Sequence, residues 1–184
     1  MNILQISGSG RNCGKTTLGC ALIAAFPALR WIAVKLTPHA HPLDPSPQSS
    51  VSSVAAPANK DTSRFCAAGA IEAHLHMPPL EPAFLAESAR RADVLLVESG
   101  QFIAPGSWPL FHLAIAPSSS ALWKPGFAER LLRLHALVLT GPFPSRETPQ
   151  YPLTLPIFHA PHPAADSVLL APSLRDLVAR FLSS

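Results

Sequence analysis

The stretch NILQISGSGRNCGKTT, from Asn2 to Thr17, indicates the fold of the whole chain. It starts as a short apolar run with strand character, continues as a glycine-rich loop, and passes into an amphipathic run from Leu18 to Phe26. In such a setting, backbone N–H groups at the N-terminus of a helix surround a phosphate group. We therefore expect a phosphate-binding loop, and the alternative is a glycine-rich turn that binds nothing.

The loop carries the residues that a nucleotide would contact. Lys15 can reach the β- and γ-phosphates, and the hydroxyl of Thr16 can hold Mg²⁺. Gly10 and Gly14 can supply the unusual backbone angles that such a loop requires. The predicted nucleotide-binding residues are Gly10, Arg11, Asn12, Cys13, Gly14, Lys15, Thr16 and Thr17.

One position departs from the usual pattern of these loops. Ser9 stands six residues before Lys15, where the first glycine of the pattern is expected. Serine is tolerable at this position if Gly8 takes the tight turn instead. We therefore retain the prediction of a nucleotide site.

Length and composition limit the remaining possibilities. The chain has 184 residues, 48% of them hydrophobic, which predicts a single domain over residues 1–184. The net charge of +3 comes from few charges and no basic run, so we expect no nucleic-acid partner. No apolar run approaches the roughly 18 residues that span a bilayer, and the start lacks a secretory signal. We expect no membrane contact and a cytoplasmic location, which the three cysteines without metal-ligand spacing also suit.

Proline is unusually frequent, with 21 residues that concentrate in the stretches 37–57 and 141–163. Because proline lacks a backbone donor and disfavours helix in the residue before it, both stretches are predicted to be loops. The first is also rich in serine and alanine. We therefore expect a flexible Pro/Ser-rich insertion at about residues 37–59, which orders when a ligand binds.

Strand-like and helical segments alternate along the chain. The expected strands are Asn2–Ser7, Trp31–Leu36, Asp93–Glu98, Phe111–Ala116, His135–Thr140 and Leu155–His159. The expected helices are Gly14–Phe26, Asp61–Ala70, Leu80–Arg91, Gly126–Leu134 and Ser173–Leu182, the last with Ser173 as its N-cap. Near-continuous apolar strands separated by helices predict a doubly wound, mostly parallel α/β sheet with helices on both faces.

Charged residues at the ends of predicted strands are candidates for the site. Glu98 ends an apolar strand, so its carboxylate is expected at the sheet edge where ligands bind. There it can hold Mg²⁺ through water or orient an attacking water. Lys35 ends another strand, and its charge suits an anionic ligand. For both residues the alternative is a solvated side chain at the edge of the sheet.

The helix that follows the insertion offers two more candidates. Asp61 can bind Mg²⁺ or position water, or it can simply cap the helix. Arg64, one turn later, can contact phosphate or a carboxylate, or lie on the surface. The predicted catalytic residues are Lys15, Asp61 and Glu98, and the predicted metal ligands are Thr16, Asp61 and Glu98.

Histidines form a weaker set of candidates. His74 and His76 can share one side of a strand, but no histidine pair has the helical i, i+4 spacing and no cysteine completes a ligand set. We expect no structural metal site. His39, close to Lys35 in sequence, is expected to contact a second anionic ligand. Lys35, His39 and Arg64 are therefore the predicted substrate-binding residues.

Four segments resemble known families. The loop GSGRNCGKT, residues 8–16, is similar to that of dethiobiotin synthetase and of the dimerising, MinD-like branch of P-loop proteins. Three further segments resemble, in order, motifs of molybdopterin-guanine dinucleotide biosynthesis protein B: a Lys-His strand end, a Lys-Asp-Ser/Thr-Arg-Ala-Gly-Ala segment and a strand ending in Glu-Gly. In this chain they read WIAVKLTPHAHP, NKDTSRFCAAGAIEAHL and ADVLLVESG, within roughly the first hundred residues.

This resemblance implies a P-loop NTPase fold and a dimeric, GTP-binding accessory of molybdenum-cofactor maturation. The motif positions of the family correspond to Lys15, Thr16, Lys35, Lys60, Asp61, Thr62, Arg64 and Glu98. The chain departs from the family at Ser9, and at Ser99, which separates Glu98 from Gly100. It departs again in the Pro/Ser-rich insertion, which replaces a tighter acidic loop.

The base of the nucleotide is left open. An Asn-Lys-x-Asp signature that reads guanine is expected after the sixth strand, but residues 137–148 read LVLTGPFPSRET. Both GTP and ATP therefore remain candidates.

The sequence favours a Mg²⁺-dependent nucleotide-binding protein with slow NTPase activity. Its expected partners are a molybdopterin-type ligand or a cofactor-biosynthesis protein, and a second copy of the chain, on which Arg11 acts across a homodimer. The first alternative is an ATP-dependent small-molecule kinase or ligase of the dethiobiotin synthetase type, with Lys35 and His39 gripping the acceptor. The second is a nucleotide-binding module without turnover.

Overall fold

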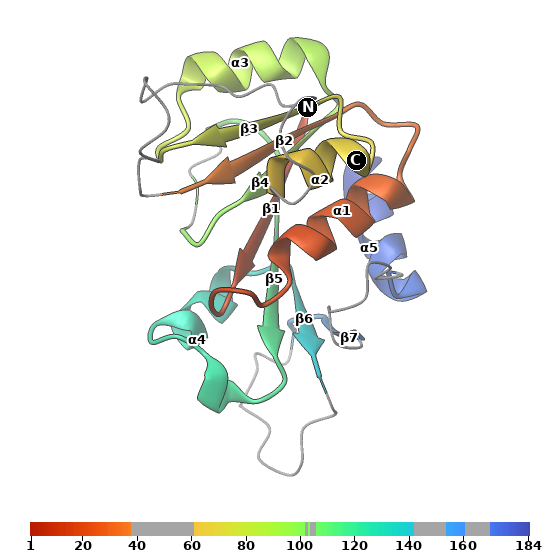
Figure 1. Cartoon of the computed structure of the whole chain (residues 1–184). Helices are drawn as coiled ribbons and strands as arrows, with labels where there is room; N and C mark the ends of the chain where they lie inside the picture. Colours follow the sequence, from red (N-terminus) through yellow and green to blue (C-terminus); the bar gives the residue numbers. More distant parts are fainter. Residues whose placement is uncertain (38–60, 102, 104–105, 142–153, 161–169) are drawn as a thin grey trace.

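The computed structural model describes residues 1–37, 61–101, 103, 106–141, 154–160 and 170–184. The predicted Pro/Ser-rich insertion lies, from residue 38 onward, outside the described residues, and so does His39. The fold described here consists of one large sheet with helices on both of its faces (Figure 1).

The sheet has seven strands in the order β3-β2-β4-β1-β5-β6-β7, and every neighbouring pair is parallel. The strands are β1 (Asn2–Gly8), β2 (Trp31–Leu36), β3 (Glu72–His76), β4 (Val94–Glu98), β5 (Leu110–Pro117), β6 (Ala136–Thr140) and β7 (Ile157–Ala160). All residues of β4 and β6 are buried, as expected for strands that are covered on both faces. The predicted doubly wound, parallel sheet is confirmed.

The helices divide between the two faces of the sheet. They are α1 (Lys15–Ala25), α2 (Asp61–Ala67), α3 (Pro82–Arg91), the short α4 (Phe127–Arg130) and α5 (Pro172–Leu182). Leu4 and Ile6 of β1 pack in one apolar cluster with α1, α2 and α5, whereas Ile3 packs with α3 on the other face. Phe127 of α4 belongs to a third cluster, with β5 and β6. Figure 1 shows α1, α2 and α5 gathered on one side and α3 and α4 away from them.

Several elements differ from the sequence predictions. Helix α2 ends at Ala67 because Gly69 adopts a left-handed φ of 115°, and the next backbone N–H, of Ala70, bonds back to Phe65. The short strand β3 follows directly and was not among the predicted strands. The N-cap prediction for Ser173 is wrong, since Pro172 takes the first helical position and Ala171 is the cap.

The predicted helix Gly126–Leu134 is also shorter than expected. Gly126, with a φ of 78°, caps the four-residue helix α4, and a 3-10 turn, η2 (Leu131–Arg133), continues it. The two pieces place Phe127 and Leu131 on the buried side before the chain enters β6. Within the described part of the chain, no helix is long and apolar enough to cross a membrane.

Candidate functional site

The glycine-rich loop runs from the end of β1 at Gly8 to the start of α1 at Lys15. Gly14, the N-cap of α1, has a φ of 100°, and Asn12 has a φ of 55°. Gly10 does not adopt a positive φ. The unusual backbone angles predicted for Gly10 and Gly14 are therefore found at Asn12 and Gly14; asparagine is one of the few residues that tolerates them.

Gly8 makes the loop possible through its missing side chain. A Cβ atom at Gly8 would lie 2.3 Å from Cys13 Sγ and 3.1 Å from the Cδ of Lys15. The loop therefore folds back directly over the end of β1, and Ser9 is almost completely buried beneath it. The backbone N–H of Ser9 donates to the carbonyl of Ile115 in β5, at 3.2 Å. Gly8 does not adopt a positive φ, so the tight turn predicted there is not found; its missing side chain instead leaves space for Cys13 and Lys15.

Lys15 lies over the loop. Its Nζ donates to the Gly10 carbonyl at 2.9 Å and lies 3.6 Å from Cys13 Sγ. The Cys13 thiol is itself 3.3 Å from the same carbonyl, and Cys13 is only 6% exposed. The Lys15 ammonium group and the Cys13 thiol thus share the Gly10 carbonyl, and both side chains pack against Gly8.

Four polar side chains from four elements meet beside the loop. The Thr16 hydroxyl, in the first turn of α1, donates to Glu98 Oε2 at 2.8 Å. Lys35 Nζ forms an ion pair with Asp61 and lies 3.7 Å from Glu98 Oε1. Burial disfavours both charges of the Lys35–Asp61 pair, yet their contact lowers the pKa of Asp61 and raises the pKa of Lys35. The predicted metal residues Thr16, Asp61 and Glu98 therefore form one cluster with Lys35, whereas the predicted catalytic residue Lys15 contacts the loop.

The sheet register explains how this cluster forms. Lys35 and Glu98 are direct partners in the pairing of β2 with β4, at the carboxyl ends of both strands. Asp61 is the first residue of α2, and Arg64, one turn later, donates to the Thr17 hydroxyl at 3.0 Å. Thr17 lies in the first turn of α1, so the contact of Arg64 joins α2 to the start of α1.

A second wall of the site was not predicted from the sequence. It comes from the segment KPGFAER, residues 124–130, which follows β5. The backbone N–H of Lys124 donates to the Ser9 carbonyl at 2.9 Å, and Arg130 donates to the Gly100 carbonyl at 2.5 Å. The signal in the sequence was two basic residues after a buried strand, but only the sheet order shows that this strand adjoins β1.

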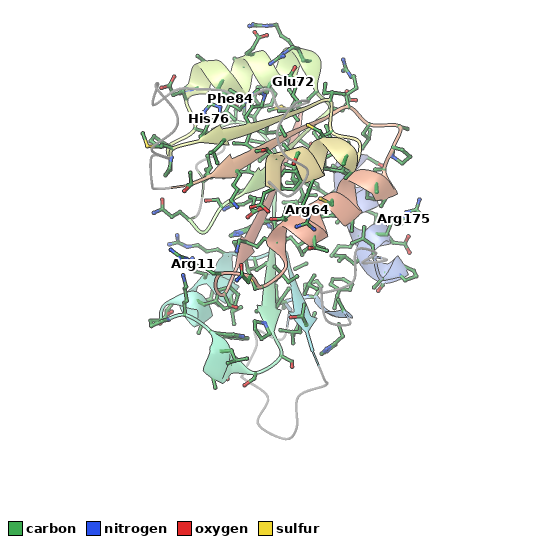
Figure 2. The ribbon with its side chains drawn as sticks, in the orientation of Figure 1. Arg11, Arg64, Glu72, His76, Phe84 and Arg175 are labelled. Atoms are coloured by element: carbon green, nitrogen blue, oxygen red, sulfur yellow. The ribbon has the colours of Figure 1, made fainter. Side chains whose placement is uncertain are left out.

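These residues surround one cavity of about 850 Å³, within the usual size range of ligand pockets. Six cationic side chains line it, those of Arg11, Lys15, Lys35, Arg64, Lys124 and Arg130, against the two carboxylates of Asp61 and Glu98. Among the described residues that line the cavity, cations thus exceed carboxylates by four. Figure 2 shows Arg11 on the α4 side of the loop and Arg64 on the opposite side, over α1 and α2. The cavity therefore suits a ligand with several negative charges.

The oxygen atoms beside Lys35 fit a magnesium ion. One hydroxyl, on Thr16, and two carboxylates, on Asp61 and Glu98, come together there. Mg²⁺ prefers oxygen donors, and it is usually held by one or two carboxylates together with phosphate and water. In the described ranges no group of three or more His, Cys, Asp or Glu residues could hold a metal.

The histidines of β3 lie apart from this cavity. His74 is buried, its Nε2 lies 2.9 Å from Glu72 Oε2, and its ring packs edge-on against Phe84 of α3. His76 also contacts the Phe84 ring, with centroids 4.5 Å apart. Figure 2 shows Glu72, His76 and Phe84 together beside α3, distant from Arg11. These two histidines therefore stabilise the packing of α3 on the sheet edge.

Fold and loop together define a class. An all-parallel sheet whose central strand leads through a Gly-Lys-Thr loop into the first helix has the P-loop NTPase fold. Neither a family model nor a curated protein matches the sequence.

Solved structures share this fold. The X-ray structure of a MobB protein homolog from Bacillus stearothermophilus matches with a TM-score of 0.51 and 21% identity, over 100% of both chains. HypB from Helicobacter pylori, determined in complex with nickel, matches with a TM-score of 0.57 and 15% identity, over 100% of this chain and 87% of that chain. MobB from Bacillus subtilis gives a TM-score of 0.47 at 20% identity, over 98% of each chain. The first of these matches confirms, at the level of the fold, the sequence resemblance to molybdopterin-guanine dinucleotide biosynthesis protein B.

Proposed function

We propose that the chain is a Mg²⁺-dependent nucleotide-binding protein with slow NTPase activity. The observation that carries this proposal is the convergence of Thr16, Asp61, Glu98 and Lys35 beside a glycine-rich loop, in a cavity with excess positive charge. Phosphate needs donors and cations, and Mg²⁺ needs carboxylate and hydroxyl oxygens. The cavity supplies both within the reach of one polyphosphate.

The loop is assigned to the phosphates. The loop leads into the N-terminus of α1, where free backbone N–H groups and the helix dipole favour negative charge. Lys15 exchanges its contact with the Gly10 carbonyl for phosphate oxygens. Nucleotide binding would then join loop, α1 and β1 into one rigid unit.

The cluster beside the loop is assigned to hydrolysis. Thr16, Asp61 and Glu98 are the residues that would hold Mg²⁺, which when bound neutralises charge on the phosphates. Glu98, nearly buried at the end of β4, would orient a water molecule toward the terminal phosphate. Lys35 supplies positive charge at the same end of the site.

Slow turnover and a homodimer are part of the same proposal. Arg64 and Arg130 line the cavity, but they are engaged with Thr17 and with the Gly100 carbonyl. Arg11 is exposed at the tip of the loop. We assign Arg11 of one copy to the nucleotide site of a neighbouring copy, where its charge would stabilise the transferred phosphate and accelerate hydrolysis.

The cellular role proposed is that of an accessory in molybdenum-cofactor biosynthesis, which takes a molybdopterin-type ligand or a cofactor-biosynthesis protein as partner. Support comes from the sequence resemblance over roughly the first hundred residues and from the shared fold with a MobB homolog. GTP and ATP are both retained as nucleotides.

The second basic wall favours one alternative function. Lys124 and Arg130 line the cavity across the loop from Lys35, so a second anionic molecule has room there. A small-molecule kinase or ligase would use that room for its acceptor. His39, the other predicted acceptor contact, lies outside the described residues.

A thermal-shift panel with ATP and GTP, each with and without Mg²⁺, followed by phosphate-release assays, tests these functions. Stabilisation that requires Mg²⁺, together with slow phosphate release without an acceptor, is the expected result. Turnover that appears only after an anionic acceptor is added would favour the kinase or ligase. Stabilisation without any product would indicate a binding module, and no stabilisation by either nucleotide would contradict the whole proposal.

A further inference from the structure

The ammonium group of Lys35 lies where a divalent cation is expected. It is paired with Asp61 and lies 3.7 Å from Glu98 Oε1, while the other oxygen of Glu98 accepts a hydrogen bond from Thr16. These are the three residues assigned to Mg²⁺. A divalent metal ion and the Lys35 ammonium group repel each other, so they compete for the carboxylates of Asp61 and Glu98.

Burial makes this contact important for Glu98. Its side chain is 5% exposed, so its charge needs a counter-ion close by. The side chains of Lys35 and Asp61 are 30% and 31% exposed and border the open cavity. The backbone of Lys35 is fixed by its pairing with Glu98. Its long side chain can therefore move into the cavity while the strand stays in place.

Other cations of the cavity are engaged elsewhere. Lys15 donates to the Gly10 carbonyl, and Arg64 donates to the Thr17 hydroxyl. Among the described residues, Lys35 is the cavity cation that forms ion pairs with Asp61 and Glu98.

We propose that Lys35 is an internal counter-ion which a divalent cation displaces. As the cation enters between Asp61 and Glu98, the ammonium group leaves these carboxylates and pairs with a phosphate oxygen of the bound nucleotide. This inference rests on the proposed function. It predicts that metal binds weakly on its own and that nucleotide strengthens metal binding, because phosphate gives the displaced ammonium group a new partner. By thermodynamic linkage, metal strengthens nucleotide binding by the same factor.

The test measures Mn²⁺ binding to the full chain without nucleotide, by the electron paramagnetic resonance signal of free Mn²⁺. Lys35→Met keeps the length of the side chain and removes its charge. We expect this variant to bind Mn²⁺ about 10-fold more tightly than the wild type, or better, because two carboxylates lose their counter-ion. Lys124→Met removes one charge from the other wall of the same cavity, and is expected to change affinity less than about 2-fold.

Two outcomes would overturn the proposal. One is Mn²⁺ binding by Lys35→Met that is no tighter than in the wild type. The other is an equal gain in Lys35→Met and Lys124→Met, which would reflect net charge alone. If Lys35→Met does not fold, as judged by circular dichroism, Lys35→Gln is measured in its place with the same expectation.

A second measurement separates this inference from the proposed function. Mn²⁺ affinity is compared with and without a saturating, non-hydrolysable nucleoside triphosphate. In the wild type the nucleotide is expected to strengthen Mn²⁺ binding, and in Lys35→Met this gain is expected to shrink. If no nucleotide binds to the wild type, the proposed function fails, but the nucleotide-free comparison still reports on Lys35. If nucleotide binds and the gain is equal in both proteins, the role of Lys35 is refuted while the nucleotide site stands.

Discussion

Replacing Gly8 with alanine is expected to destabilise the protein at the base of its loop. The new Cβ would lie 2.3 Å from Cys13 Sγ and 3.1 Å from the Lys15 side chain. Cys13 is only 6% exposed, so its thiol has no open space to enter. We expect this overpacked methyl group to lower the free energy of unfolding by about 1–3 kcal/mol. For a chain of this length, that corresponds to a fall in Tm of about 2–12 °C.

Urea denaturation followed by circular dichroism measures this change, and a matched set of variants isolates its cause. Gly100→Ala is the control, because no atom lies within 4 Å of a Cβ at Gly100. Gly8→Ala combined with Cys13→Ala removes the sulfur atom that clashes, so the double variant is expected to recover about 1 kcal/mol or more relative to additivity. The reasoning is refuted if Gly8→Ala is as stable as Gly100→Ala, or if it loses the same stability with and without the Cys13 thiol.

Three further predictions concern single side chains. Lys15→Ala is expected to abolish the thermal stabilisation by nucleotide, and a shift that survives would place the phosphate grip elsewhere. Glu98→Gln is expected to keep nucleotide binding through the loop and Lys15, and to slow phosphate release by about 10-fold or more; unchanged release would remove Glu98 from the catalytic assignment. His112 is buried in β5, and burial lowers its pKa from the ordinary 6.5 to about 4. Between these values the unfolded chain binds a proton that the folded chain does not, so folding stability falls as the pH falls from 6.5 toward 4. Urea denaturation across this range is expected to show a shallower pH dependence for His112→Asn than for the wild type, and parallel profiles would contradict it.

The sequence allowed much of the site to be located, because the sheet is parallel. Lys35 and Glu98 each end an apolar strand, and the carboxyl ends of parallel strands meet at one edge. The loop and α1 follow from the Gly-Lys-Thr pattern after a strand. Such a pattern involves only neighbouring residues, so it can be recognised without knowing how distant segments pack.

The remaining features depend on contacts between distant segments. The ion pair of Lys35 with Asp61 requires the start of α2 to lie beside the end of β2. Hydrophobic periodicity predicts the helix and the strand but not their contact. Lys124 and Arg130 enter the site because β5, and not another strand, adjoins β1. The left-handed angle at Asn12, a position where the sequence pattern called for no special backbone angle, is seen only in the folded loop.

The pairing of Lys35 with Glu98 in adjacent strands also bears on how this protein tolerates insertions and deletions. Their spacing is set by the hydrogen-bonded ladder of β2 and β4, so residues gained or lost in the connections outside the ladder leave it unchanged. A single residue inserted inside β2 would turn Lys35 to the opposite face of the sheet and bring a neighbour to its place. Insertions and deletions that preserve the site are therefore expected in the connections between the strands and not within β2 or β4.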